Sequence, residues 1–255
     1  MTLTDLFPIL FILGVLFAST FVRATFGFGD ALVAMPILAL AIDLRTAAPI
    51  VALVSTTIGI IIILKTWKEI QFRSAWRLII SSIAGIPCGV YMLKEVHDSI
   101  VKCVLALMIA GFSMYKLTTG NSATLITERA SYFFGFLAGL FGGACSTPGP
   151  PVVIYGSLRK WNPASFRATL QGFFFVSGSV VLAGHLGTGL WTRDVIQTYL
   201  FALPVVLFAI YLGNKVHYKI PSAKFDSYLY VLLLLSGILL FMRNIGQMII
   251  TMTRA

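Results

Sequence analysis

An arginine and an aspartate in a short glycine-rich segment are the residues best suited to do chemistry in this chain. Arg23 lies seven residues before Asp30, and the aspartate follows the tetrapeptide Phe-Gly-Phe-Gly and precedes a long apolar run. If that run lies in a membrane, a carboxylate there costs about 2.5–3.5 kcal/mol, which marks it as a functional-site candidate. One interpretation is a carboxyl group that takes up and releases a proton during transport. The alternative is an N-cap for the helix that follows.

Arg23 also allows two interpretations. Its planar guanidinium group fits anions that carry several oxygens, because it can donate two parallel hydrogen bonds to them. Otherwise the side chain extends to a membrane interface or pairs with Asp30. The spacing of the two residues leaves both roles open.

A second segment, FGGACSTPGPP at residues 141–151, offers neutral hydrogen-bond donors. These are the hydroxyls of Ser146 and Thr147 and the backbone N–H groups before Pro151. Because the N-terminus of a helix carries a positive partial charge, a half-helix that begins here can bind an anion. Alternatively, the hydroxyls only cap that helix. We expect this segment to be richer in donors than the first.

Together the two segments predict one anion site. The residues expected to bind the substrate are Arg23, Gly27, Gly29, Gly143, Ser146, Thr147 and Gln171, with Asp30 as the proton-coupling group. No cluster of His, Cys, Asp or Glu has the spacing of a metal site, so neither a metal nor another cofactor is expected. His185 is conceivable as a proton relay, but nearby glycines favour a histidine at a membrane interface.

The composition places these segments in a membrane. Of the 255 residues, 58% are hydrophobic and 11% are charged, whereas soluble domains contain roughly 25% charged residues. The chain has no phosphate-binding GxxxxGK[ST] motif, which excludes an ATP-driven pump within it. Its bases are scattered over short loops, which argues against a nucleic-acid partner and for the lipid bilayer.

Apolar runs between charged residues predict the membrane spans. We expect spans at 6–22, 46–64, 78–93, 103–115, 168–192, 195–214 and 227–242, most of them close to the roughly 17–25 residues that a crossing helix needs. The run at 31–42 is too short to cross alone, and the run at 130–158 is interrupted by the second segment. Because unpaired backbone groups are costly in hydrocarbon, both interruptions must be buried in protein or line a wet cavity.

The two interrupted segments align with each other. A shift of 115 positions pairs Phe26 with Phe141 and Pro36 with Pro151. We therefore predict an all-α integral membrane protein of two repeats, residues 1–120 and 121–255, each with a broken, re-entrant helical element followed by three transmembrane helices. Three crossings per repeat make the repeats inverted, a plan typical of secondary transporters.

The distribution of basic residues predicts the orientation. If each broken element returns to the side from which it came, twelve bases share one face and six share the other. Because cytoplasmic loops carry an excess of Lys and Arg, the twelve-base face is expected in the cytoplasm and both termini outside it. The N-terminal segment lacks the basic region and cleavage site of a signal peptide, so we interpret it as a retained helix.

The first segment and its later copy resemble the TauE/SafE sulfite exporter family, also called the toluene sulfonate uptake permease family. The resemblance rests on GFGDALVAMPIL at 27–38 and on the glycine-rich copy that contains Pro-Pro, and it extends over nearly the whole chain. It implies movement of small organosulfur anions, such as sulfite or sulfonates, across the inner membrane, usually outward. The family often has a glycine or another small residue where this chain has Asp30.

These features predict a multi-pass secondary transporter, not an enzyme, for a small sulfonate or sulfite, with Asp30 coupling export to protons. A passive anion channel is the first alternative, although a channel needs no buried titratable group. A membrane-embedded enzyme is the second, and no motif such as GxSxG or HExxH supports it. The sequence leaves open the exact substrate and whether copies of the chain form a homo-oligomer.

Overall fold

The described part of the chain consists of ten helices and no strand. The computed structural model describes residues 3–66, 72–119, 127–161, 163–216 and 222–253. The helices are α1 (Leu3–Phe26), α2 (Asp30–Ala41), α3 (Leu44–Thr66), α4 (Phe72–Glu95), α5 (Asp98–Thr119), α6 (Ala130–Cys145), α7 (Gly149–Leu158), α8 (Pro163–Gly187), α9 (Arg193–Val216) and α10 (Ser222–Thr253). The all-helical class predicted from the sequence is confirmed.

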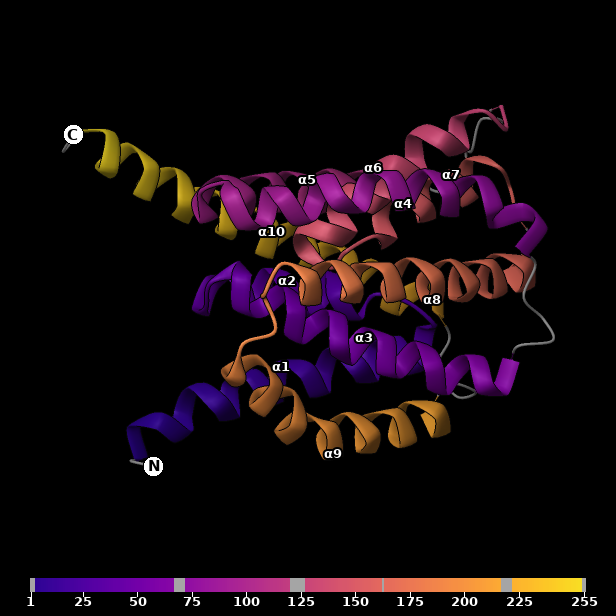
Figure 1. The fold of residues 1–255 in the computed structure, drawn as a ribbon. Helices are drawn as coiled ribbons and strands as arrows, with labels where there is room; N and C mark the ends of the chain where they lie inside the picture. The colour runs from indigo at the N-terminus through magenta and orange to yellow at the C-terminus, as the bar shows by residue number, and fades with distance from the viewer. Residues whose placement is uncertain (1–2, 67–71, 120–126, 162, 217–221, 254–255) are drawn as a thin grey trace.

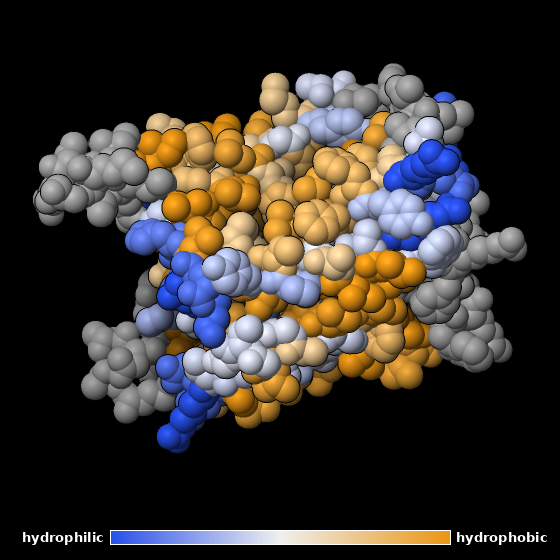
Figure 2. All heavy atoms as spheres, turned by 45° about the horizontal axis from the view of Figure 1, so that its top comes forward, coloured by the Kyte–Doolittle hydropathy of each residue, from blue (hydrophilic) through white to orange (hydrophobic). Residues whose placement is uncertain are grey.

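Six of these helices, namely α1, α3, α4, α5, α8 and α9, are long and apolar enough to cross a membrane. Large hydrophobic side chains on them are exposed, among them Leu64, Tyr91 and Leu200. Hydrophilic residues gather at the two ends of the molecule and leave a broad apolar band between them (Figure 2). Such a surface would associate in water but faces lipid in a bilayer. The chain is therefore a multi-pass membrane protein.

Polar contacts mark the two ends of the helical bundle. At one end, Arg45 at the start of α3 donates to the carbonyl oxygen of Lys94 at 2.6 Å. At the other, Glu128 before α6 pairs with Arg77 of α4 and with Arg159 after α7. Because the ion pair between Glu128 and Arg159 joins the start of α6 to the end of α7, α7 returns to the end from which α6 came (Figure 1).

The first broken element folds back in the same way. α2 lies beside α1, and the carbonyl of Leu40 at its end accepts from Arg243 of α10. The start of α1 and the end of α10 lie at the same end of the bundle (Figure 1). With 12 residues, α2 is only about 18 Å long, too short for a hydrocarbon core of about 30 Å. Its residues are buried on nearly every side, which explains why its sequence is apolar all round.

Glycines let α4 and α6 pack backbone against backbone. A Cβ atom added at Gly139 would lie 2.1 Å from the carbonyl oxygen of Ser82, and one at Gly143 would lie 2.3 Å from that of Ile86. Gly85 of α4 faces α6 in the same manner. Small residues at a helix interface allow this close approach, which is common in membrane proteins. The packing fixes the end of α6, where the second break begins.

Candidate anion site

The two breaks meet at one buried cavity of about 50 Å³. Residues from α1, α2, α3, α6, α7 and α8, and from the two breaks, line it: Arg23, Gly29, Asp30, Ala31, Leu32, Ala52, Ser55, Thr56, Gly142, Ser146, Thr147, Pro148, Gly149, Phe174, Gly178 and Val181. Of the residues predicted from the sequence, Arg23, Gly29, Asp30, Ser146 and Thr147 therefore lie together. Both interruptions of the helices therefore line a cavity within the protein, which is where non-helical backbone is tolerated in a membrane protein.

The first break is a turn made by two glycines between α1 and α2. Gly27 has φ 88° and Gly29 has φ 101°, a left-handed conformation that glycine adopts without steric cost. Gly29 occupies the N-cap position of α2, and no side chain caps that helix. The interpretation of Asp30 as an N-cap is therefore wrong, because Asp30 is the first helical residue.

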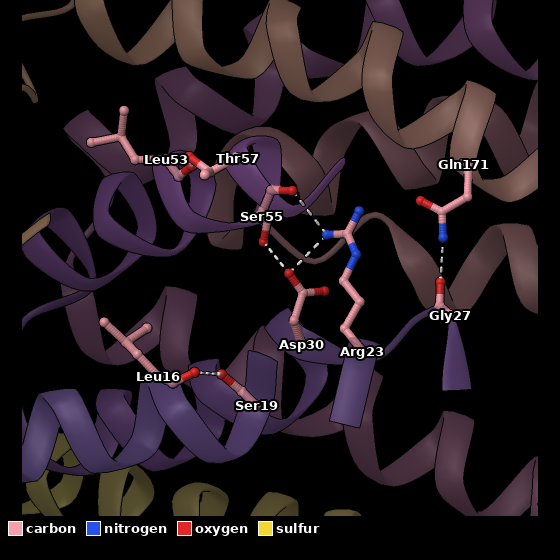
Figure 3. A network of polar contacts seen from close by, with 9 residues as sticks. All are labelled: Leu16, Ser19, Arg23, Gly27, Asp30, Leu53, Ser55, Thr57 and Gln171. Carbon is pink, nitrogen blue, oxygen red and sulfur yellow. Dashed lines mark hydrogen bonds and ion pairs between the residues drawn. The ribbon is translucent and has the colours of Figure 1, made fainter. Parts of the chain in front are cut away.

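The carboxylate of Asp30 instead forms an ion pair with Arg23. Arg23 Nη1 lies 2.8 Å from Asp30 Oδ2, and the two side chains are 3% and 10% exposed. Ser55 of α3 donates its hydroxyl to the same oxygen, and its carbonyl accepts from Arg23 Nη1 at 3.1 Å. Figure 3 shows these three residues converging from three helices. A buried charge needs such pairing, because an unpaired one would cost several kcal/mol.

The opposite edge of the Arg23 guanidinium is open. Its Nε and Nη2 atoms are buried, and neither has a hydrogen-bond partner among the described residues. These two nitrogens carry the parallel N–H groups with which an arginine binds two oxygens of one anion. The ring of Phe174 lies 5.5 Å from Arg23 Cζ. Buried donors of a charged group are costly to leave unpaired, so this edge favours a ligand.

The second break is neutral. Ser146 adopts a left-handed conformation with φ 53° at the end of α6, and its hydroxyl donates to the carbonyl of Ala48 at 2.8 Å. The backbone N–H of Thr147 donates to the carbonyl of Phe141 at 3.2 Å. The hydroxyl of Thr147 is buried, lacks a hydrogen-bond partner among the described residues and belongs to a residue that lines the cavity. Thr147 thus offers one free hydroxyl to an occupant, whereas Ser146 joins the break to α3.

The first break presents more backbone donors than the second. In α2 the first intrahelical bond runs from Val33 N–H to the Gly29 carbonyl, which leaves the amides of residues 30–32 without a partner in the helix. In α7, Pro150 and Pro151 have no N–H, so Gly149 supplies the one such amide before the first intrahelical bond can form. The expectation that the second segment is richer in donors is therefore wrong.

Three predicted residues, Gly27, Gly143 and Gln171, lie outside the cavity lining. Gln171 of α8 donates to the carbonyl of Gly27 at 2.6 Å (Figure 3). Gly143 packs against α4, and its carbonyl lies 2.9 Å from His185 Nε2. Because a carbonyl only accepts, that nitrogen must carry a proton. His185 is fully buried within the protein, two residues before the end of α8. It satisfies a carbonyl that the end of α6 leaves unpaired.

Sequence reasoning missed Ser55 and Phe174. Ser55 begins the triplet Ser-Thr-Thr within the apolar run of α3, and such a polar cluster inside a span is a usable signal. Phe174 is the middle one of three consecutive phenylalanines, and nothing in the pattern indicates which ring faces the cavity. Among the described residues, no group of three or more His, Cys, Asp or Glu side chains could hold a metal ion.

Two broken helices that meet at a cavity with a buried Arg23–Asp30 pair, inside a bundle of long apolar helices, are the plan of a membrane transporter. The family model "Sulfite exporter TauE/SafE" matches residues 10–240. The chain therefore belongs to the TauE/SafE family of membrane transporters, as its glycine-rich motifs predict.

Two relatives agree with this assignment. The chain is 26% identical over 221 residues to "Probable sulfite/organosulfonate exporter TauE" of Cupriavidus necator, covering 82% of this chain and 84% of that protein. It is 24% identical over 174 residues to "Probable inner membrane transporter protein TsaS" of Comamonas testosteroni, covering 68% and 73%. No solved structure matches the chain.

Proposed function

We propose that the protein is a secondary carrier that exports a small sulfur oxyanion, sulfite or a small sulfonate, across the inner membrane. The observation that carries this proposal is the open edge of Arg23, a cavity-lining residue whose Nε and Nη2 are buried without partners among the described residues. Two parallel N–H groups suit two oxygens of one sulfur centre. The amides at the start of α2 and the hydroxyl of Thr147 are further donors, and the names of the two relatives are consistent with such a substrate.

Asp30 gives this site a means of coupling to protons. The carboxylate holds Arg23 at 2.8 Å, so part of the guanidinium charge is neutralised while Asp30 is ionised. Protonation of Asp30 releases that charge to the anion, whereas deprotonation repels the anion. Substrate and proton therefore favour each other's binding, and this linkage is reciprocal. A passive channel has no use for such a pair, because conduction needs no titration.

Alternating access follows from the proposed repeat. Residues 1–120 and 121–255 each contain one broken element and three further described helices, and both breaks contribute residues to the lining of the same cavity. In carriers built from inverted repeats, one repeat rocks against the other around a fixed site. Here the site would stay with Arg23 and Asp30 while the helices that pack around the breaks open one end and then the other.

The orientation rests on the charges at the two ends. Arg77, Lys116 and Arg159 form polar contacts at the end that carries the larger number of bases, and that end is proposed to be cytoplasmic. Lys68 lies outside the described residues. In a variant without the three native cysteines, a single cysteine introduced by Lys68→Cys should resist an impermeant thiol reagent in intact cells and react after permeabilisation. Ready labelling of that cysteine in intact cells would reverse the orientation.

The function is tested by efflux of sulfite from proteoliposomes that contain the purified protein. A carrier predicts saturable efflux that exceeds that of empty liposomes and is inhibited by other small sulfur oxyanions. Efflux that rises linearly with concentration and carries current would favour the channel. No efflux above empty liposomes, for sulfite or any small sulfonate, would contradict the proposal.

A further inference from the structure

We propose that Phe174 sets the upper size limit of the substrate, so that the site accepts an oxyanion close to sulfite in size and rejects sulfonates with a longer alkyl chain. The inference rests on the proposed function and narrows its substrate class. It is carried by three observations: the volume of the cavity, the position of the Phe174 ring in its wall, and the absence of spare room at the neighbouring glycines.

The cavity is small. Its volume of about 50 Å³ has room for about three or four water-sized groups. A sulfite ion, with one sulfur and three oxygens, fills this space once two oxygens face the open edge of Arg23. An alkyl sulfonate needs further room for each carbon of its chain, and a cavity of this volume offers little of it.

Phe174 occupies the place that such a chain would need. Its ring lines the cavity and lies 5.5 Å from Arg23 Cζ. A Cβ atom added at Gly149, the first residue of α7, would lie 3.8 Å from Phe174 Cζ. The ring therefore fills the space between the guanidinium group and the start of α7. Truncation of this ring is the change that enlarges the site between the two breaks.

The part of α8 that follows Phe174 packs closely against α3. Gly178 lies one helical turn after Phe174, and a Cβ atom added there would lie 3.2 Å from Thr56 Oγ1, which is tight for a carbon-oxygen contact. α8 thus approaches α3 closely at this level, and a substrate chain cannot extend along it. The size limit is therefore assigned to one side chain.

The experiment measures how well a series of alkyl sulfonates competes with sulfite for efflux from proteoliposomes. In the wild type, methanesulfonate should compete, and propanesulfonate should need at least about tenfold higher concentration for the same inhibition. Phe174→Ala should abolish this difference, because it removes the ring and opens the wall. Phe174→Leu removes the aromatic face beside Arg23 but keeps most of the bulk, so it should retain the wild-type order and separate size from the contact with the cation.

Phe175→Ala is the matched control, because the neighbouring ring is exposed on the outside of the bundle and does not line the cavity. This variant also loses a phenyl ring, but the order in which the sulfonates compete with sulfite should stay as in the wild type. Equal competition by all sulfonates in the wild type would overturn the size limit and leave the carrier intact, as would an unchanged order in Phe174→Ala. Absence of sulfite efflux in the wild type would instead overturn the proposed function. If Phe174→Ala does not fold, the wild-type series and Phe174→Val decide.

Discussion

The two breaks of this molecule solve the same problem with different residues. The first turns through two glycines and contains a buried ion pair between Arg23 and Asp30. The second turns through Ser146, is followed by a proline-rich helix start, and has no charged residue in the cavity lining. The charged residues of the cavity lining therefore come from the first break and its flanking helices, whereas the second break contributes neutral residues.

Under the proposed repeat, the counterparts of the charged pair are small and uncharged. The shift of 115 positions relates Arg23 to Ala138 and Asp30 to Cys145, and both counterparts are fully buried. At Ala138 and Cys145 the second repeat therefore packs against its neighbours where the first repeat places charges. A carrier can use both features: close packing in one half, and in the other an ion pair that includes a carboxylate. Variants of each half can be compared.

The largest effect is expected from Gly143→Ala, which attacks the shape of the second break. The new Cβ atom would lie 2.3 Å from the backbone oxygen of Ile86, so α4 and α6 would have to separate. Overpacking costs about 1–3 kcal/mol and occasionally more, and a contact with backbone, which cannot rotate away, places this variant at the upper end. We expect a large drop in the thermal unfolding temperature in detergent. Gly111→Ala, where nothing lies within 4 Å of the added atom, is the control and should unfold like the wild type.

Arg23→Ala tests the charged side of the comparison. Loss of a charge-assisted hydrogen bond costs about 1.5–3 kcal/mol, so sulfite should bind roughly 10- to 150-fold more weakly. Arg23→Lys keeps the charge but loses the paired donors, so its affinity for sulfite should lie between that of the wild type and that of Arg23→Ala. Titration calorimetry of the purified variants measures both. An Arg23→Ala protein that binds sulfite as tightly as the wild type would remove Arg23 from the site.

The smallest effect is expected from Thr147→Val in the second break. The hydroxyl has no hydrogen-bond partner among the described residues, so only its bond to the substrate is lost, at about 0.5–1.5 kcal/mol. Sulfite affinity should fall by roughly 2- to 13-fold, and Thr147→Ser should keep it. A loss as large as that of Arg23→Ala would mean that the two breaks share the recognition equally, against the comparison drawn above.

The sequence predicted the breaks and much of the cavity lining because those features are local. Glycines, prolines and a lone acid within apolar runs locate Arg23, Asp30, Ser146 and Thr147 without knowledge of the packing. It did not identify Ser55 or Phe174, because these residues reach the cavity only through the packing of α3 and α8 against the breaks. The partner of His185 could not be predicted for the same reason, since it is the carbonyl of Gly143 in another helix. The number of donors in the second break was overestimated because Pro150 and Pro151 have no N–H group and the Ser146 hydroxyl already donates to Ala48.

We propose that Asp30, which follows the first break, couples anion movement to protons, and this role can be tested directly. Asp30→Asn keeps a group of the same size that can accept from Arg23 and Ser55, but it cannot titrate. The decisive measurement is sulfite efflux from proteoliposomes with and without an imposed pH gradient. The account predicts that the gradient accelerates efflux by the wild type and has no effect on Asp30→Asn, which still carries sulfite down its own gradient. A variant that responds to the pH gradient as the wild type does would contradict the account.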